Sequence, residues 1–178
     1  MFQRSASLEG ARSADILLRV PAPYVLRAAV VVPRPRDEVF AFFAQAENLG
    51  TLTPPELGFR ILTPLPVVMG AGALIDYTIR LWMVPMVWRT RITAWEPPLR
   101  FVDDQIRGPY RLWSHQHTFV EVDGGTRIED EVHYLLPFGI LGRLVAPLIR
   151  LQLARIFRYR EATVRSLFPP SKIPPTDE

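Results

Sequence analysis

The 178-residue sequence has no cysteine and a single lysine, Lys172. The absence of cysteine excludes disulfide bonds, thiol catalysis and thiolate metal sites. The scarcity of lysine means that arginine carries almost all of the basic charge behind the net charge of +3. A mild basic excess permits contact with an anionic surface but does not require nucleic acid, and no stacking motif in a basic groove accompanies it. We therefore predict no nucleic-acid partner.

The sequence also lacks a long apolar run that is free of charge. A membrane-spanning helix needs about 20 consecutive, mainly apolar residues. The most apolar stretch, residues 138–157, is interrupted by Arg143, Arg150 and Arg155. The first residues carry charges before any apolar run, unlike a secretory signal. With 48% hydrophobic and 22% charged residues, the composition is typical of a soluble globular protein, and we predict a cytoplasmic one.

The periodic segments divide the chain into three parts. Residues 1–22 show no sustained periodicity and are interpreted as an N-terminal extension. Residues 23–168 contain the clear strand and helix patterns, and this length is sufficient for one domain with a full core. Residues 169–178 contain four prolines, so we predict a disordered, proline-rich tail.

Turn signals separate a series of β-forming segments from a helical region. Residues 35–50 repeat apolar side chains at helical spacing, so we predict a helix that ends with Gly50 as its C-cap. Residues 53–56 predict a second, short helical turn. The predicted strands are residues 24–32, 59–63, 73–82, 86–95 and 99–107. Short turns between successive strands favour an antiparallel meander over parallel βαβ units.

Residues 107–134 predict a β-hairpin around which the rest of the chain is organised. Asp123-Gly124-Gly125 is a turn signal between two β-forming runs. Side chains alternate between the faces of a strand. One face of the first arm therefore carries Trp113, His115, His117 and Phe119. The corresponding face of the second arm carries Ile128, Asp130, Val132 and Tyr134. Aromatic side chains mixed with a few polar groups are typical of the wall of a ligand cavity.

After Pro137 the apolar period changes from that of a strand to that of a helix. One apolar stripe is formed by Leu144, Val145, Leu148, Ile149, Leu153, Ile156 and Phe157. We predict a long amphipathic helix that ends near Phe168. Its stripe should cover the apolar face of the sheet, in preference to lying on anionic lipid. A cavity would remain between a curved sheet and this helix.

The element order and several motifs resemble the START-like (SRPBCC) superfamily over residues 24–168. The resemblance rests on the run Phe-Val-Asp-Asp-Gln at 101–105, the run Gly-Pro-Tyr-Arg at 108–111, and the hairpin pattern described above. That superfamily includes lipid-transfer START domains, coenzyme Q-binding proteins, pollen allergens and polyketide cyclases/dehydrases. It implies an α+β, helix-grip fold, in which a curved antiparallel sheet of about six to seven strands grips a long C-terminal helix. One or two short helices would follow the first strand.

The resemblance and the hairpin pattern together imply a cavity for a small hydrophobic ligand, such as a lipid, an isoprenoid quinone or a polyketide-like aromatic. We predict that the apolar wall comprises Tyr77, Trp88, Phe101, Trp113 and Phe119. The polar end of the ligand would be held by Gln105, His115, His117, Asp130 and Tyr134. Binding or transport without catalysis and without a cofactor is the leading hypothesis. The polar groups are equally consistent with a buried network that satisfies only itself.

Two alternative functions use other features of the sequence. A cyclase or dehydratase would use His115 or His117 in acid–base catalysis beside Asp130, Asp103 or Tyr134, because a carboxylate partner orients an imidazole. A membrane-associated lipid-transfer protein would use the apolar segment 82–88, which begins at Trp82 and ends at Trp88. Packing of this segment inside the protein is the competing interpretation.

The pair His115-x-His117, followed by Glu121, resembles half of a cupin metal motif. The rest of that motif is absent, because the next glycines come too early and a cupin lacks a long C-terminal helix. His133 lies on the opposite face of its strand. We therefore predict no metal site, with His115 and His117 hydrogen-bonded within the cavity wall.

Overall fold

The computed structural model describes residues 22–81 and 83–170. Most of the predicted N-terminal extension, Trp82 and most of the predicted proline-rich tail lie outside the described residues. The described elements, in chain order, are β1 (Tyr24–Val32), α1 (Arg36–Phe43), the 3-10 helices η1 (Ala46–Leu49) and η2 (Pro55–Leu57), β2 (Arg60–Ile61), β3 (Leu74–Leu81), β4 (Val84–Glu96), β5 (Arg100–Arg107), β6 (Leu112–Val122), β7 (Gly125–Leu135) and α2 (Ile140–Leu167).

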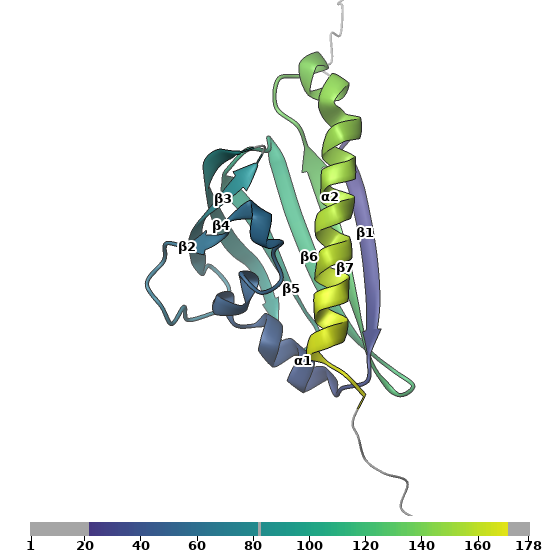
Figure 1. The fold of residues 1–178 in the computed structure, drawn as a ribbon. Helices are drawn as coiled ribbons and strands as arrows, with labels where there is room; N and C mark the ends of the chain where they lie inside the picture. Colours follow the sequence, from purple (N-terminus) through teal and green to yellow (C-terminus); the bar gives the residue numbers. More distant parts are fainter. Residues whose placement is uncertain (1–21, 82, 171–178) are drawn as a thin grey trace, which may run out of the picture.

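The strands form one antiparallel sheet in the order β1-β7-β6-β5-β4-β3-β2. Successive strands from β2 to β7 pair with their neighbours, as the short turns predict, and β1 joins the far side by pairing with β7 from Tyr24↔Tyr134 to Val32↔Thr126. The sheet curves around α2, which lies along its concave face, and α1 covers one end (Figure 1). This arrangement confirms the predicted α+β helix-grip fold.

The predicted hairpin is formed by β6 and β7, with Val122 paired with Gly125 across the turn. A side chain at Gly125 would place its Cβ 2.1 Å from the carbonyl oxygen of Val32. Only glycine therefore leaves room for the chain where β1 ends beside this turn. The register brings His117 opposite Asp130 and His115 opposite Val132. The turn therefore fixes which polar groups meet on the concave face.

The first helix is shorter than the sequence predicts. Helix α1 ends at Phe43, and the chain continues through Ala44 into η1 instead of reaching Gly50. The side-chain amide of Asn48 donates a 2.8 Å hydrogen bond to the carbonyl oxygen of Phe42. This bond satisfies a carbonyl group that a continuing helix would have used, so the helix ends early.

Helix α2 begins and ends close to the predicted positions, but only part of its apolar stripe covers the sheet. Leu153, Phe157 and Val164 are buried, whereas Leu144 and Leu148 are 72% and 49% exposed. The 28 residues of α2 rise about 42 Å along the helix axis. The 11-residue strands β6 and β7 span only about 36 Å. The first turns of α2 consequently extend past the sheet (Figure 1).

No helix in the described part of the chain combines the length and the apolarity that are needed to cross a bilayer.

Candidate functional site

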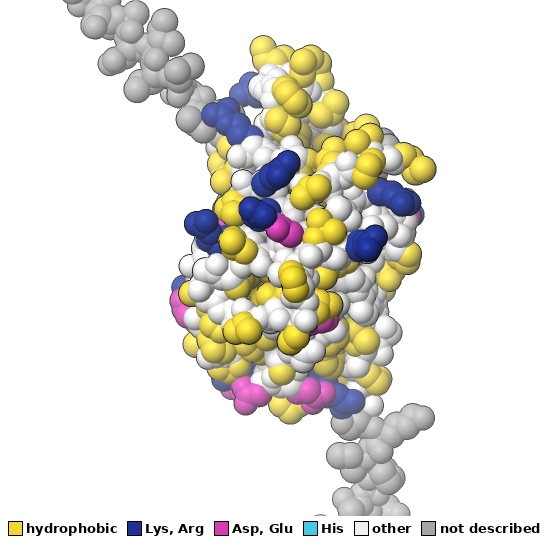
Figure 2. All heavy atoms as spheres, turned by 90° about the vertical axis from the view of Figure 1, so that its left-hand side faces the viewer, with side chains coloured by type: hydrophobic (Ala, Val, Ile, Leu, Met, Phe, Trp, Pro, Cys, Tyr) yellow, Lys and Arg dark blue, Asp and Glu magenta, His cyan; other side chains and the backbone are white. Residues whose placement is uncertain are grey.

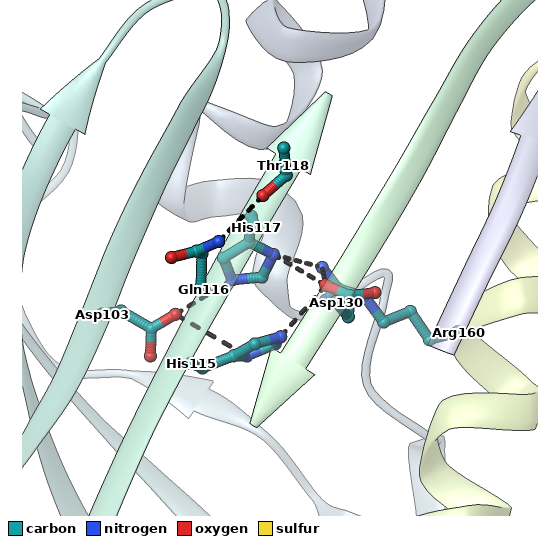
Figure 3. A network of polar contacts seen from close by, with 7 residues as sticks. All are labelled: Asp103, His115, Gln116, His117, Thr118, Asp130 and Arg160. Atoms are coloured by element: carbon teal, nitrogen blue, oxygen red, sulfur yellow. Dashed lines mark hydrogen bonds and ion pairs between the residues drawn. The ribbon is translucent and has the colours of Figure 1, made fainter. Parts of the chain in front are cut away.

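A buried network of ionisable side chains joins three strands to helix α2 (Figure 3). His115 and His117 come from β6, Asp130 from β7 and Asp103 from β5. The Nε2 atom of His115 lies 3.0 Å from Asp130 Oδ1, and the Nε2 atom of His117 lies 2.9 Å from Asp103 Oδ2. Each histidine therefore has a carboxylate partner on a neighbouring strand.

Arg160 of α2 completes this network from the helix that covers the sheet. Its Nε and Nη2 atoms donate 3.3 Å hydrogen bonds to the two carboxylate oxygens of Asp130. Its Nη2 atom also lies 3.1 Å from Nδ1 of His117. Arg160 and Asp130 are 9% and 6% exposed, so this ion pair is shielded from water.

Sequence reasoning missed Arg160, because arginines recur along the whole helix and most face solvent. The position of Arg160 relative to the apolar residues of α2 nevertheless indicates that it is buried. Leu153, Phe157, Arg160 and Val164 follow one another at intervals of three or four residues, which places them on the same buried side of α2. A charged residue in the middle of an apolar stripe indicates a buried partner.

Burial and charge set the protonation states of the network. Burial raises the pKa of Asp130, but the Arg160 charge and hydrogen bonds from both histidines outweigh it and hold this pKa well below its usual range. Burial likewise opposes ionisation of Asp103, but hydrogen bonding to His117 and the nearby positive charges lower its pKa overall. Both carboxylates are therefore ionised at neutral pH.

The two histidines shift in opposite directions. Burial lowers the pKa of His117, but hydrogen bonds to Asp103 and Asp130 reverse the effect and raise it overall. Burial and the charge of His117 lower the pKa of His115 despite its bond to Asp130. Of the two rings, His117 is therefore the one whose protonated form the network favours, because its two ring nitrogens lie 2.9 Å from Asp103 and 2.9 Å from Asp130.

We expect this network to make the stability of the protein depend on pH through Asp130. A carboxyl group whose pKa is depressed by folding stabilises the protein fully above its unfolded pKa, here 3.8, and loses that contribution as the pH falls further. The native protein should therefore be more stable than Asp130→Asn at neutral pH, and the difference should shrink below pH 3.8. Urea unfolding of both proteins from neutral pH to below pH 3.8 measures this difference in stability. A difference that does not change with pH would contradict the assigned ion pair.

Two cavities that share part of their walls lie on the concave face of the sheet. The larger, of about 150 Å³, is bounded by side chains that include Ile79, Leu81, Trp88, Trp113, Leu153 and Ile156. The smaller, of about 50 Å³, is bounded by side chains that include Phe43, Met69, Ile75, Ile92 and Phe101. Tyr77, Asp103, His117 and Arg160 border both. Part of the polar network thus lies where the walls of two mainly apolar cavities meet.

The structure places most of the predicted site residues on these walls. Tyr77, Trp88 and Trp113 border the larger cavity together with His115 and His117. Phe101 borders the smaller one, where its ring stacks on His117 at a centroid distance of 4.2 Å. Side chains outside the predicted site also contribute to the walls: Phe43, Leu52, Phe157 and Arg160, together with Asp103, which the sequence offers only as a possible carboxylate partner of the histidines.

Four predicted residues border neither cavity. The Gln105 amide donates a 2.7 Å hydrogen bond to the carbonyl oxygen of Tyr110, so it holds the bend before β6 instead of facing a ligand. Phe119 is 2% exposed and packs edge-on against Phe40 and Phe43 in the core below α1.

The other two predicted residues, Asp130 and Tyr134, lie behind the cavity wall. Asp130 contacts the histidines and Arg160 from the side away from the cavity, so it acts through them. Tyr134 is 2% exposed and packs against Tyr24 and Tyr110. Alternation along a strand predicts the face of each residue correctly, but it cannot tell which part of that face borders open space and which part is covered.

Three of the network residues have the chemistry of a metal site. Asp103, His115 and His117 each offer a ligand atom, and these atoms lie within 4.8 Å of one another. Glu121, the third member of the cupin-like pattern, is instead 67% exposed. A divalent cation at this position would compete with the hydrogen bond between His117 Nε2 and Asp103 and would lie near the Arg160 guanidinium, and both effects oppose binding.

A curved antiparallel sheet that grips a C-terminal helix around a cavity defines a START-like, helix-grip protein. The chain belongs to the family described as polyketide cyclase / dehydrase and lipid transport, whose sequence profile matches residues 32–158. A comparison with curated proteins gives no sequence match.

Solved structures share the fold at low sequence identity. The Zhui aromatase/cyclase from Streptomyces sp. R1128 is 15% identical with a TM-score of 0.65, and the match covers 81% of this chain and 92% of that one. A START superfamily protein from Mycobacterium smegmatis is 13% identical with a TM-score of 0.61, covering 80% and 98%. A nucleoside-diphosphate sugar epimerase from Corynebacterium glutamicum is 24% identical with a TM-score of 0.56, covering 79% of this chain but 28% of that one. These similarities establish the fold.

Proposed function

We propose that the protein binds a small hydrophobic molecule in the larger cavity, with the polar end of that molecule against the His–Asp network. The observation that supports this proposal is the contrast within one cavity. Its walls are mainly apolar and aromatic, whereas Asp103, His115, His117 and Arg160 gather on one side. A mainly apolar pocket with a few converging polar groups is the usual form of a small-molecule site.

The size of the cavity favours a ligand that inserts a single ring. The larger cavity has a volume of about 150 Å³, and an apolar cavity of about this volume accommodates benzene. Trp88 stacks on Tyr77 at a centroid distance of 5.9 Å and meets Trp113 edge-on at 5.3 Å. Such surfaces favour an aromatic or quinone-like ring. Of the ligand classes implied by family membership, quinone or polyketide-like rings match this wall better than a bulky lipid.

The charge balance of the network favours a neutral polar group on that ring. The Asp103 side chain is 18% exposed, whereas those of His117 and Asp130 are 5% and 6% exposed. Asp103 is therefore the most accessible acceptor at the polar side of the cavity. A ligand hydroxyl group can donate to it, whereas a ligand carboxylate would meet a like charge.

A matched pair of probes tests this assignment. We expect p-cresol to bind about tenfold more tightly than toluene, because its hydroxyl group donates to the partly buried Asp103 carboxylate. Quenching of tryptophan fluorescence reports binding, since Trp88 and Trp113 line the cavity. In the His115→Gln/His117→Gln protein, p-cresol affinity should fall by no more than about tenfold, roughly 1.4 kcal/mol. Equal affinity of the native protein for both probes would contradict the polar anchor, and no binding of either would contradict the cavity site.

Acid–base catalysis is a second candidate function, and the geometry of His115 favours it. Its Nε2 atom is held by Asp130 at 3.0 Å, while its Nδ1 atom is 3.7 Å from Asp103 and makes no hydrogen bond with it. A neutral imidazole held in this tautomer has a free basic nitrogen near the cavity. With a reactive ligand, an enzyme of this kind would lose turnover in His115→Gln while retaining binding.

A further inference from the structure

The beginning of helix α2 carries an exposed apolar surface that neither the sheet nor the cavity uses. The α2 apolar surface comprises residues that are each at least 48% exposed: Phe138, Ile140, Leu141, Leu144, Val145, Leu148 and Leu151. Figure 2 shows hydrophobic side chains gathered at this end of the molecule. A contiguous surface of this kind marks a place of contact with another molecule or with a membrane.

The backbone holds the tip of this surface outward. Phe138 and Gly139 both have positive φ angles, 65° and 53°, immediately before α2 begins. A left-handed conformation is uncommon for a non-glycine residue and is unfavourable for a bulky one. Phe138 nevertheless remains 81% exposed. Burial within the described part of the chain therefore does not offset this strain, which is consistent with an external contact.

The charge around the surface has one sign. Residues 138–151 contain two arginines, Arg143 and Arg150, and no aspartate or glutamate. Among the described residues, neither Arg143 nor Arg150 lies within ion-pair distance of a carboxylate. The first turn of α2 has no acidic residue to offset the positive end of the helix dipole. Arg111 and Arg143 both border a groove of about 250 Å³ beside the helix start.

We propose that the α2 apolar surface docks onto an anionic phospholipid surface, with its arginines on the lipid phosphates. A helix that combines exposed apolar residues with arginines is suited to the boundary between headgroups and acyl chains. A second copy of the chain would fit less well. Symmetric pairing would bring two clusters of unpaired arginines together without any acidic partner in this segment.

A second exposed element supports the same contact. The turn between β3 and β4 exposes Met83 and Val84 to 86% and 52%, whereas Trp88, which the sequence also placed in this apolar segment, is 4% exposed and lines the cavity. Leu81 at the end of β3 and Leu153 of α2 both border the larger cavity. The cavity thus lies between the two elements that would contact the lipid. Docking does not depend on the proposed ligand, because its residues lie outside the cavity walls.

Co-sedimentation of the full chain with vesicles tests the proposal. We expect binding to vesicles of phosphatidylcholine and phosphatidylserine in equal parts, and at least about tenfold weaker binding to phosphatidylcholine alone. Leu141→Gln/Leu144→Gln and, separately, Arg143→Gln/Arg150→Gln should each weaken binding to the mixed vesicles by about tenfold or more. These side chains are exposed, and glutamine is a good helix former, so both variants should fold.

Matched controls remove equal numbers of similar side chains elsewhere. Val68→Gln/Leu99→Gln and Arg27→Gln/Arg127→Gln should bind the mixed vesicles like the native protein. Equal binding by native protein and both α2 variants, or equal binding to the two kinds of vesicle, would overturn the proposal. It would also be overturned if the native protein failed to bind vesicles and light scattering showed a dimer that the leucine variant abolishes. That result would assign the surface to a second copy of the chain.

Discussion

Replacing Arg160 with methionine is expected to lower the free energy of unfolding by about 3–5 kcal/mol, because it leaves a buried charge without its partner. Asp130 receives two hydrogen bonds from α2, and Arg160 donates both of them. Both residues are buried. Methionine retains much of the aliphatic bulk of arginine, so the loss of stability reports the removal of the charge. Urea unfolding at neutral pH, monitored by circular dichroism, gives the difference.

Arg158→Met is the matched control, since Arg158 is an exposed arginine on the same helix. Its free energy of unfolding should change by less than about 0.5 kcal/mol. Adding Asp130→Asn to Arg160→Met should restore part of the lost stability, because the buried carboxylate that has lost its guanidinium partner is then removed. If Arg160→Met and Arg158→Met were equally stable, Arg160 would not be the counterion of the network.

Two single variants, Phe119→Ala and Trp113→Ala, should separate effects on the free energy of unfolding from effects on ligand affinity. Phe119→Ala is expected to lower the free energy of unfolding by about 3–5 kcal/mol, as for other buried phenylalanines. It should leave the affinity for p-cresol unchanged, because Phe119 packs against Phe40 and Phe43 and borders neither cavity.

Trp113→Ala should instead affect the affinity for p-cresol more than the free energy of unfolding. Trp113 is only half-buried and forms part of the larger cavity wall. Its removal should weaken p-cresol binding by about tenfold or more, through the loss of one aromatic contact and of cavity shape. Quenching of Trp88 still reports the titration in this variant. A large loss of binding in Phe119→Ala at temperatures where it remains folded would show that the core and the cavity wall are not distinct.

The fold was predictable because the strongest sequence signals are local. The turn at 123–125 and the two-residue alternation around it determine the register that brings His117 opposite Asp130. Family membership had the same basis, since its motif residues lie on β5, β6 and β7 and in the bend between β5 and β6. The early end of α1 was not predictable in this way. It depends on the Asn48 side chain, which bonds to a carbonyl group six residues earlier.

The network was only half predictable for a related reason. The histidines and Asp130 lie on paired strands, so strand periodicity brings them together. Arg160 lies 30 residues beyond Asp130 and reaches them from helix α2, and no local pattern specifies which turn of a covering helix faces which strand. The exposure of Leu144 has a similar origin, because periodicity shows that an apolar face exists but not how far the sheet extends beneath it.

A crystal structure of the protein saturated with p-cresol would test the central claim most directly. The claim predicts electron density for the ring in the larger cavity, between Trp88 and Trp113, with the hydroxyl oxygen within hydrogen-bond distance of Asp103. It also predicts that Arg160 keeps its contacts with Asp130, since the network is complete before the ligand binds. A ring bound elsewhere, or a cavity closed by its own aromatic side chains, would contradict the claim.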